Sequence, residues 1–411
     1  MRETRFKDTE IGLIPENWEV KKLGDVAEIA RGGSPRPIES FLTSSCDGVN
    51  WIKIGDVGVK SKYIEHTEER IIKSGAIRSR VVHSGDFLLS NSMSFGRPYI
   101  LKIDGCIHDG WLVIQDYQDF FNVDYLYYVL CSENVLSQYK TMAAGSSVLN
   151  LNKEIVKKVL VPFPSNKKEQ SVVANMLSDV DGLLREFGEL IAKKKAIKMG
   201  MMQELLTVEA MPGKEGAFRP KRRLEGFEGD WVEKRLGELA QITMGQSPSS
   251  SCYNVSCEGL PLIQGNADIK DRKTIIRVYT SQSTKVCEKG DVIMSVRAPV
   301  GAVGIASFDS CIGRGVCSFK SKNGFLFHYL VFFEDKWSEF SKGSTFDSIN
   351  SADLYDIKFV FPLDEAEQTA IAELLSDMDA EIGALEAKRA KYEQVKNGMM
   401  QELLTGKIRL V

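Results

Sequence analysis

The chain has 411 residues, of which 43% are hydrophobic and 27% are charged, and its formal net charge at pH 7 is −3. This length exceeds what one hydrophobic core usually organises, so it predicts two or more domains. No apolar run approaches the roughly 20 residues that a membrane helix needs, and the polar start MRETRFKDTE is unlike a signal peptide. The near-neutral charge neither requires nor excludes nucleic acid, because a DNA-binding protein needs a basic surface rather than a basic total.

The eight cysteines are scattered, and none belongs to a CxxC pair. This spacing argues against a zinc ribbon and against a thioredoxin-like site. A metal site could be imagined with Cys252, Cys257 and Cys287 as three ligands. A fourth ligand at a sensible spacing is lacking, so ordinary thiols are the better interpretation. We therefore expect reduced cysteines, no metal and a cytoplasmic location.

The first 165 residues have the pattern of a mixed α/β domain. Short apolar runs with Gly-Asp turns predict strands at 49–57, 80–90, 99–103 and 111–115. Residues 124–139 are expected to be helical, and a Gly/Ser-rich loop (143–152) and a last strand before VPFP should follow. Loops on such scaffolds commonly carry function.

Residues 166–210 predict one long helix of about 40 residues, or ~60 Å at 1.5 Å per residue. Asn166 stands at the expected N-cap behind Pro164, and Glu169 three residues later gives a start that resembles a capping box. Apolar residues then alternate at spacings of four and three, which is the heptad pattern of a helix-pairing seam. The seam consists of Val173, Leu177, Val180, Leu184, Phe187 and Ile191.

The second half follows the same order. Residues 211–363 predict a second mixed domain, with strands at 260–264, 291–296, 303–307 and 315–319, a helix at 325–340 and a polar loop at 341–350. Residues 364–411 predict a second long helix that starts at Asp364. Its seam consists of Ile371, Leu375, Met378, Ile382 and Leu385.

The two halves are copies of one another. GMMQELLT stands at both 200–207 and 398–405. Further matches pair Trp18 with Trp231, Ser34-Pro35 with Ser247-Pro248, Pro164 with Pro362, Glu169-Gln170 with Glu367-Gln368, and Leu177-Ser178-Asp179 with Leu375-Ser376-Asp377. The separation between matched residues drifts across the globular parts and is constant along the helices. One part of each half varies freely, and the other keeps its length.

A long apolar seam must be buried against a partner. A coil between two molecules is one alternative, but two copies on one chain favour intramolecular antiparallel pairing. We therefore expect an α+β (mixed α/β) protein in which two similar globular domains are joined by two long antiparallel coiled-coil helices. The internal duplication makes this arrangement pseudo-two-fold.

Signatures of catalysis are missing. The sequence contains neither a P-loop GxxxxGK[ST] nor HExxH, and it shows no Gly-rich cofactor signature. His108 is adjacent to Asp109, but its repeat partner is Gly313, so we interpret His108 as a polar residue at a strand end. The chain is expected to lack a catalytic centre and a cofactor of its own.

Two similar but diverged domains at a fixed spacing suggest a bipartite binder, and the repeat of duplex DNA makes spacing meaningful. The order of domain, helix, domain, helix resembles the DNA specificity (S) subunit of type I restriction–modification systems. So do the phrases NWEVKKLGDVAEIARGGSP, VPFP…KEQ, FPLDEAEQ and MMQELLTGKIRL. The resemblance covers essentially the full length.

The resemblance implies target recognition domains at 1–165 and 211–363, each reading one half of a split, asymmetric site in double-stranded DNA. It implies conserved spacer helices at 166–210 and 364–411 that set the gap between the halves. It also implies two methyltransferase subunits, which carry S-adenosylmethionine, and translocase–endonuclease subunits for cleavage. The absence of an (N/D)PP(Y/F) signature from this chain agrees with that division of labour.

Base-reading side chains are expected in polar loops beside strands, since Arg or Lys reads guanine and Asn or Gln reads adenine. For any single candidate, a solvated turn residue and a base contact are equally good interpretations. In the first domain the candidates are Arg31, Lys53, Asn91, Ser92, Ser94 and Arg97, with Ser146 as a phosphate anchor. In the second they are Gln264, Asn266, Arg297 and Arg314, with Ser344 as the anchor. The basic run Arg219, Lys221, Arg222 and Arg223 is interpreted as a solvated linker.

Two alternatives stay open. One is a coiled-coil scaffold that binds only proteins. The other is the recognition chain of a fused nuclease or methyltransferase, against which the missing motifs argue.

Overall fold

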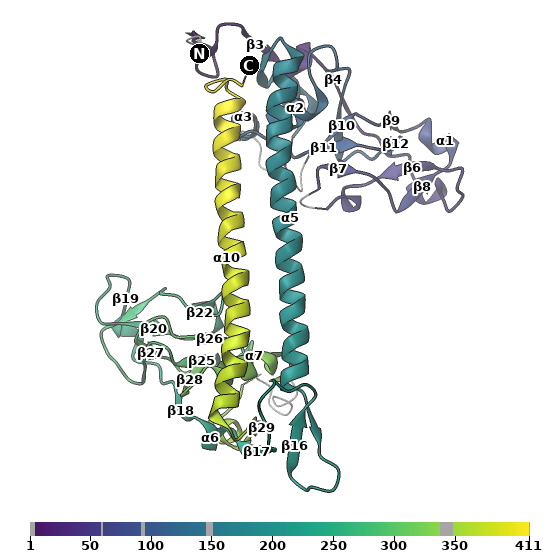
Figure 1. Ribbon diagram of the computed structural model, residues 1–411. Helices are drawn as coiled ribbons and strands as arrows, with labels where there is room; N and C mark the ends of the chain where they lie inside the picture. Colours follow the sequence, from purple (N-terminus) through teal and green to yellow (C-terminus); the bar gives the residue numbers. More distant parts are fainter. Residues whose placement is uncertain (1–4, 59–60, 92–94, 145–150, 338–347, 411) are drawn as a thin grey trace. The chain divides into compact units, whose positions relative to one another are not determined.

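The computed structural model describes residues 5–58, 61–91, 95–144, 151–337 and 348–410. The chain divides into two compact units, Met1–Phe187 with Lys388–Val411, and Gly188–Ala387. The two long helices, α5 (Lys167–Leu206) and α10 (Glu365–Leu403), each begin in one unit and end in the other (Figure 1). Each unit therefore contains one globular part, the start of one long helix and the end of the other.

The globular part of the first unit is built on two sheets, with orders β4-β13-β10-β11-β7 and β5-β8-β6-β12-β9. Its strands are β1 (Phe6–Lys7), β2 (Ile14–Pro15), β3 (Trp18–Lys22), β4 (Glu28–Arg31), β5 (Leu42–Thr43), β6 (Val49–Ile52), β7 (Tyr63–Ile64), β8 (Glu69–Ile71), β9 (Arg80–Val82), β10 (Phe87–Ser90), β11 (Pro98–Leu101), β12 (Gly105–Ile107), β13 (Trp111–Gln115) and β14 (Leu160–Pro164). Its helices besides the long ones are α1 (Lys73–Ala76), α2 (Val123–Leu130), α3 (Glu133–Ala143) and α4 (Lys153–Lys158), with short 3-10 turns η1 (Leu23–Asp25), η2 (Ile38–Ser40) and η3 (Ile54–Asp56).

The second unit repeats this plan, with sheet orders β18-β28-β25-β26-β22-β21 and β19-β23-β20-β27-β24. Its strands are β15 (Val208–Ala210), β16 (Ala217–Pro220), β17 (Trp231–Arg235), β18 (Gln241–Met244), β19 (Tyr253–Asn254), β20 (Leu260–Ile263), β21 (Ile269–Lys270), β22 (Lys273–Thr274), β23 (Tyr279–Thr280), β24 (Val286–Cys287), β25 (Val292–Ser295), β26 (Val303–Ile305), β27 (Ser310–Ile312), β28 (Val316–Lys320) and β29 (Lys358–Pro362). Its short helices are α6 (Leu236–Leu239), α7 (Phe325–Phe332) and α9 (Ser351–Asp356), with 3-10 turns η4 (Ser250–Cys252), η5 (Asn266–Asp268) and η6 (Glu334–Lys336).

Strands are found in each predicted segment, but the prediction of one strand at 80–90 is wrong, since β9 and β10 belong to different sheets. Strand β6 ends at Ile52, ahead of η3, and the last strand, β14, includes VPFP rather than preceding it. The two long helices have 40 and 39 residues, as expected. The single helix predicted at 124–139 is wrong. It is two helices, α2 and α3, because Ser132 acts as the N-cap of the second and its hydroxyl accepts the Val135 N–H at 3.4 Å. Helix α4 was not predicted; Asn152 caps it by accepting the N–H groups of Glu154 and Ile155.

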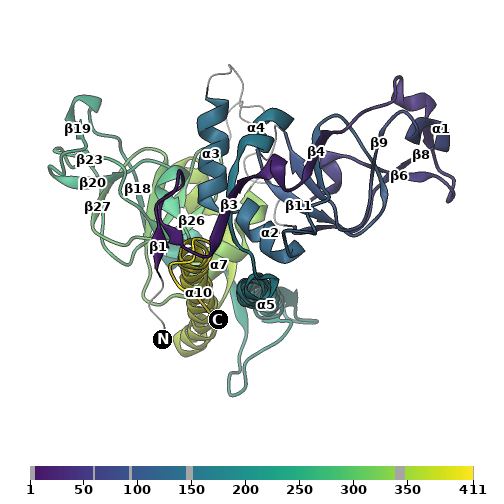
Figure 2. The same ribbon diagram turned by 90° about the horizontal axis from the view of Figure 1, so that it is seen from above.

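A short helix of each globular part packs against the start of a long helix. In the first unit α2 lies between α5 and the sheet that contains β11 (Figure 2), and the Tyr128 hydroxyl lies 3.1 Å from the Ser178 hydroxyl. In the second unit His328 Nε2 of α7 lies 2.9 Å from the Ser376 hydroxyl. The repeated Leu-Ser-Asp motif is thus where each long helix contacts a short helix of its globular part.

The repeated Pro and Gln residues form a joint at the entry to each long helix. The Gln170 side-chain amide donates to the Pro164 carbonyl at 2.9 Å, and the Gln368 amide donates to the Pro362 carbonyl at 2.8 Å. Gln170 is fully buried, so its hydrogen bond satisfies a backbone carbonyl that water does not reach, and the matching Gln368 is half-buried. The joint fixes the angle at which the last strand turns into the helix.

The repeated glutamates do not close capping boxes, and that expectation was wrong. Glu169 and Glu367 are buried, and each accepts a hydrogen bond of 3.3 Å from the indole of Trp18 or Trp231. The Glu carboxylates are needed as partners for buried indole N–H groups and for arginines, and the helix start is instead capped by Asn166 and Asp364.

The arginine that completes each cluster lies in the chain segment that follows the other long helix. Arg409, which follows α10, forms two bonds of 2.8 and 2.7 Å to the Glu169 carboxylate. Arg223, which follows α5, forms bonds of 2.9 and 2.7 Å to Glu367. We call each group of Trp, Glu and Arg a clasp. Arg223 was interpreted as part of a solvated linker, but its guanidinium is committed to this buried carboxylate.

The long helices run antiparallel within each unit. In the first, Phe187 of α5 stacks on Tyr392 of α10, and six residues earlier Asp181 pairs with Lys396 at 2.6 Å. In the second, Lys194 pairs with Glu381 at 2.7 Å, and four residues later Lys198 pairs with Asp379 at 2.5 Å.

The predicted seam residues are all buried or half-buried. Val173 and Leu177 join the core of the first unit together with Leu403 and Leu404, and Ile371 and Leu375 join that of the second together with Leu205 and Leu206. The remaining seam positions are Val180, Leu184, Phe187, Ile191, Met378, Ile382 and Leu385. The GMMQELLT ends therefore close the cores of the globular parts. Coiled-coil packing along the full length of the helix pair stays a prediction.

Arg409→Ala should destabilise the first unit by about 3 kcal/mol, because it leaves the Glu169 carboxylate buried without its cation. Arg223→Ala should do the same to the second unit. Denaturant unfolding followed by tryptophan fluorescence measures both effects. The control is Arg222→Ala, an exposed neighbour whose loss should change stability by less than about 0.5 kcal/mol. Equal stability of Arg223→Ala and Arg222→Ala would refute the clasp.

The second unit should lose stability as the pH falls from 6.5 to 4. Burial lowers the pKa of His328 to about 4, so the unfolded chain binds this proton at a higher pH than the folded chain does. The contribution is complete above pH 6.5 and is lost at up to roughly 1.4 kcal/mol per pH unit until about pH 4. His328→Gln keeps a donor for Ser376 and should flatten this part of the stability profile. His66→Gln, at an exposed histidine, should not.

Candidate DNA interface

The ends of four strands of the second unit, two from each of its sheets, bring three loops together. Strands β20 and β27 are parallel, with Ile263 beside Ile312, so their carboxyl ends emerge together. Strands β25 and β28 are antiparallel, with Ser295 beside Val316, so the end of one adjoins the start of the other. This topology brings the loops that follow Ile263, Ser295 and Ile312 to a common surface.

These loops line a pocket of about 580 Å³. It contains all four described candidates of the second domain, Gln264, Asn266, Arg297 and Arg314, and each of them is exposed. Among the described residues, no Asp or Glu lines this pocket, and no side-chain hydrogen bond or ion pair commits any of the four. The pocket therefore presents two cations and two amides that are available to a ligand.

The backbone beneath these side chains is held in place. The Asp268 carboxylate accepts the N–H groups of Gln264 and Gly265 at 2.7 and 3.2 Å, and the Ser247 hydroxyl accepts the Arg314 N–H at 3.1 Å. Gly245 must be glycine, since a Cβ there would collide with the Gly313 carbonyl. The repeated Gly and Ser of this motif thus serve to position the residue at 314.

The first unit repeats this frame with a different side chain. The Ser34 hydroxyl lies 3.3 Å from the Asp109 N–H, and a Cβ on Gly32 would collide with the His108 carbonyl. Asp109 therefore occupies the position that Arg314 has in the second unit. Asp109 was not among the predicted residues, although the repeat alignment, which matches Asp109 with Arg314, held the signal.

Asp109 is an accessible, ionised carboxylate. It is 44% exposed, accepts the Ser34 hydroxyl at 3.1 Å and lies 3.4 Å from the Arg36 guanidinium. Partial burial acts to raise the pKa of Asp109, but the Ser34 hydrogen bond and the charges of His108 and Arg36 outweigh it and leave the pKa below its usual value.

His108 itself holds the turn. Its Nδ1 accepts the Gly110 N–H at 2.6 Å, and burial lowers the pKa of His108. This arrangement agrees with its interpretation as a polar residue at a strand end.

The other described candidates of the first domain have partners within the unit. Lys53 pairs with Glu69 at 2.7 Å, a bond that raises the pKa of Lys53, and the guanidinium of Arg97 lies over the Tyr99 ring. Asn91 is buried. Ser92, Ser94, Ser146 and Ser344 lie outside the described residues.

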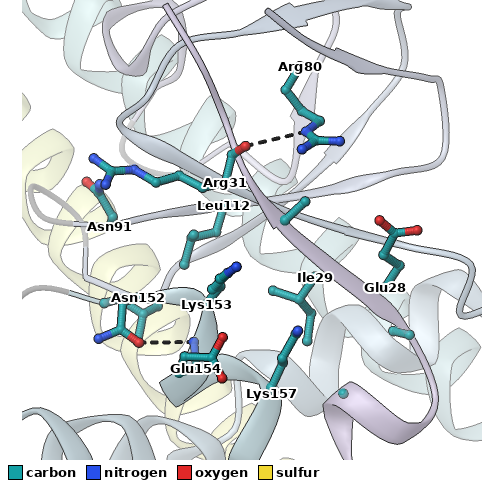
Figure 3. Close-up of a pocket in the computed structure, with 14 residues that line it drawn as sticks. Glu28, Ile29, Arg31, Arg80, Asn91, Leu112, Asn152, Lys153, Glu154 and Lys157 are labelled. Atoms are coloured by element: carbon teal, nitrogen blue, oxygen red, sulfur yellow. Dashed lines mark hydrogen bonds between the residues drawn. The ribbon is translucent and has the colours of Figure 1, made fainter.

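Arg31 and Asn91 line a second pocket, of about 830 Å³, between β4 and α4 (Figure 3). Arg80, Lys153 and Lys157 also line it, together with Glu28 and Glu154. The guanidinium of Arg31 is anchored by donating to the Asp109 carbonyl at 3.0 Å, which links this pocket to the frame around Asp109. The lysines were missed; the basic run KEIVKK behind the capping Asn152 was the available signal.

Within the described part of the chain, no group of three or more His, Cys, Asp or Glu side chains is placed to hold a metal ion. The cysteines are free thiols. No helix among the described residues is long and apolar enough to cross a membrane.

The chain is thus a duplicated scaffold that carries two unlike polar surfaces. The profile of the type I restriction modification DNA specificity domain matches residues 15–192 and 228–396. The chain therefore belongs to the family of type I restriction–modification specificity subunits, which are non-catalytic.

Individual relatives agree with this membership. The type I restriction enzyme MjaX specificity subunit of Methanocaldococcus jannaschii is 32% identical and is matched over 100% of this chain and 98% of its own length. A chain from a structure of the type I R-M system has a TM-score of 0.64 at 24% identity and covers 96% of this chain and 99% of that one. The S subunit from Mycoplasma genitalium has a TM-score of 0.56 at 15% identity, with coverage of 94% and 96%. These two structures support the fold.

Proposed function

We propose that each globular part reads one half of a bipartite, asymmetric site in double-stranded DNA, and that the paired helices set the gap between the halves. The observation that carries this proposal is the contrast between the two copies. Their backbone frames at Ser34 and Ser247 match, while the exposed side chains on those frames differ. A duplicated reader of one sequence would keep the same side chains, so different halves of a site are the simplest target.

The spacing role rests on the helices. Their matched residues keep a constant separation, and charged pairs such as Asp181 with Lys396 and Lys194 with Glu381 oppose sliding of one helix along the other. A fixed register is what a ruler between two reading sites requires.

The same helices are proposed to dock two methyltransferase subunits, which would carry S-adenosylmethionine, and through them the translocase–endonuclease subunits. Exposed apolar side chains on α5, such as Leu190, Ile197 and Met199, suit a protein partner more than solvent. The proposed location of this complex is the cytoplasm.

Exchange of residues 241–350 for the equivalent segment of a relative should change one half-site and leave the other intact. This segment carries the second reading surface and spares Trp231, Arg223 and the last strand. Binding selection from random duplex DNA, with the methyltransferase subunits present, measures both halves. A change in both halves would refute modular reading. Salt-dependent binding without sequence preference would indicate a scaffold, and DNA methylation by the purified chain alone would indicate a fused enzyme.

Insertion of one heptad into both helices, after Phe187 and after Ala387, should widen the gap by about three base pairs. Seven residues add about 10.5 Å of helix and nearly two whole turns, so the pairing faces are kept. Insertion into α5 alone is the control, since it breaks the register of the charged pairs and should destabilise the chain. An unchanged gap in a folded double insertion would exclude the ruler.

A further inference from the structure

The two units place opposite charges at one matched position. The backbone around it is the same in both. The Gly32 N–H donates to the Trp111 carbonyl at 2.9 Å, and the Gly245 N–H donates to the Val316 carbonyl at 3.0 Å. Both loops lie under a serine hydroxyl that accepts the N–H of Asp109 or Arg314. The difference between the units at this point is therefore one of side-chain chemistry on a shared frame.

Arg314 can only donate hydrogen bonds. Its guanidinium carries a fork of N–H groups and no acceptor, which matches the O6 and N7 acceptors of guanine in the major groove. It lines the same pocket as Arg297, and no acidic side chain stands among the lining residues that the structure describes.

Asp109 can only accept them when it is ionised. A carboxylate is repelled by phosphate, so at a DNA surface it needs a donor from a base. The exocyclic amino group of cytosine is the partner that carboxylates take in the major groove. Its present contact with Arg36 is an exposed pair, and such pairs contribute little and exchange readily.

We propose that Asp109 and Arg314 are specificity-determining residues at the matched position of the two half-sites, with Arg314 selecting guanine and Asp109 selecting cytosine. This inference rests on the proposed function, because it assigns bases within half-sites that the two units read. The residue is held by the Ser34 or Ser247 hydroxyl at the end of the same loop in each copy. Exchange of one side chain therefore changes the base that is read without rebuilding the domain.

The test is binding selection from random duplex DNA with the full chain in complex with its methyltransferase subunits. Arg314→Gln should change the preference at one base pair of one half-site, with guanine reduced at least tenfold relative to adenine. Asp109→Asn should change one base pair of the other half-site from cytosine to adenine, since an amide pairs with adenine. Arg235→Gln and Asp119→Asn, at exposed positions away from the two loops, should leave both half-sites unchanged.

The outcomes separate the two levels of the argument. If the wild-type complex enriches no two-part sequence, the proposed function itself fails. If it enriches one and the Arg314 and Asp109 variants leave every base unchanged, this inference alone is overturned. Uniform weakening with a smaller salt slope would assign Arg314 to phosphate and would also overturn it. Thermal unfolding at the wild-type temperature shows that each variant is folded.

Discussion

The structure depends on a buried carboxylate at the start of each long helix. Glu169 and Glu367 are removed from water, so each requires partners for its charge, and it takes them from an indole and from a guanidinium. The tryptophan comes from the strand that enters the globular part, and the arginine comes from the segment behind the other long helix. A single ion thus ties together three stretches that are far apart in the sequence. A buried carboxylate without its cation is strongly destabilising, so arrangements of the chain that leave either glutamate unpaired are disfavoured.

The clasp also accounts for the repeated residues. The two halves of the sequence share Trp18 and Trp231, the paired Glu-Gln motifs and the GMMQELLT ends. In the structure they hold the helix ends to the globular parts. Constant residues belong to this joint and to the core beneath it, and the surface loops are free to differ. A specificity subunit needs that separation, because recognition must change while assembly stays the same.

The polar surfaces of the two units show how variation is confined to side chains. In the second unit, parallel β20 and β27 deliver Gln264 and Arg314 to the same edge, and the glycine–serine loop fixes the backbone below. In the first unit the same loop presents Asp109. The backbone geometry of the loop is common to both units. The side chain at the matched position sets the chemistry of each surface.

Several features were accessible from the sequence alone. Periodicity predicted both long helices and their seams, because a 3.6-residue period is a local property. The duplication and the family followed from matched motifs, and the four candidates of the second domain do line one pocket. Lys53 and Arg97 looked equally suitable, yet their charges have neighbours at Glu69 and Tyr99 that no local pattern indicates.

The sequence by itself determined the order of elements, the repeat and the polar character of the loops. Only the tertiary structure decided which charges are committed. Glu169 was interpreted as a capping residue and Arg223 as a linker residue, whereas the structure places each in a buried pair. The repeat alignment already matches Asp109 with Arg314, and the structure adds that a serine hydroxyl holds both in the same way. The reason is physical: the role of a charge depends on what is desolvated with it, and those partners are distant in the chain.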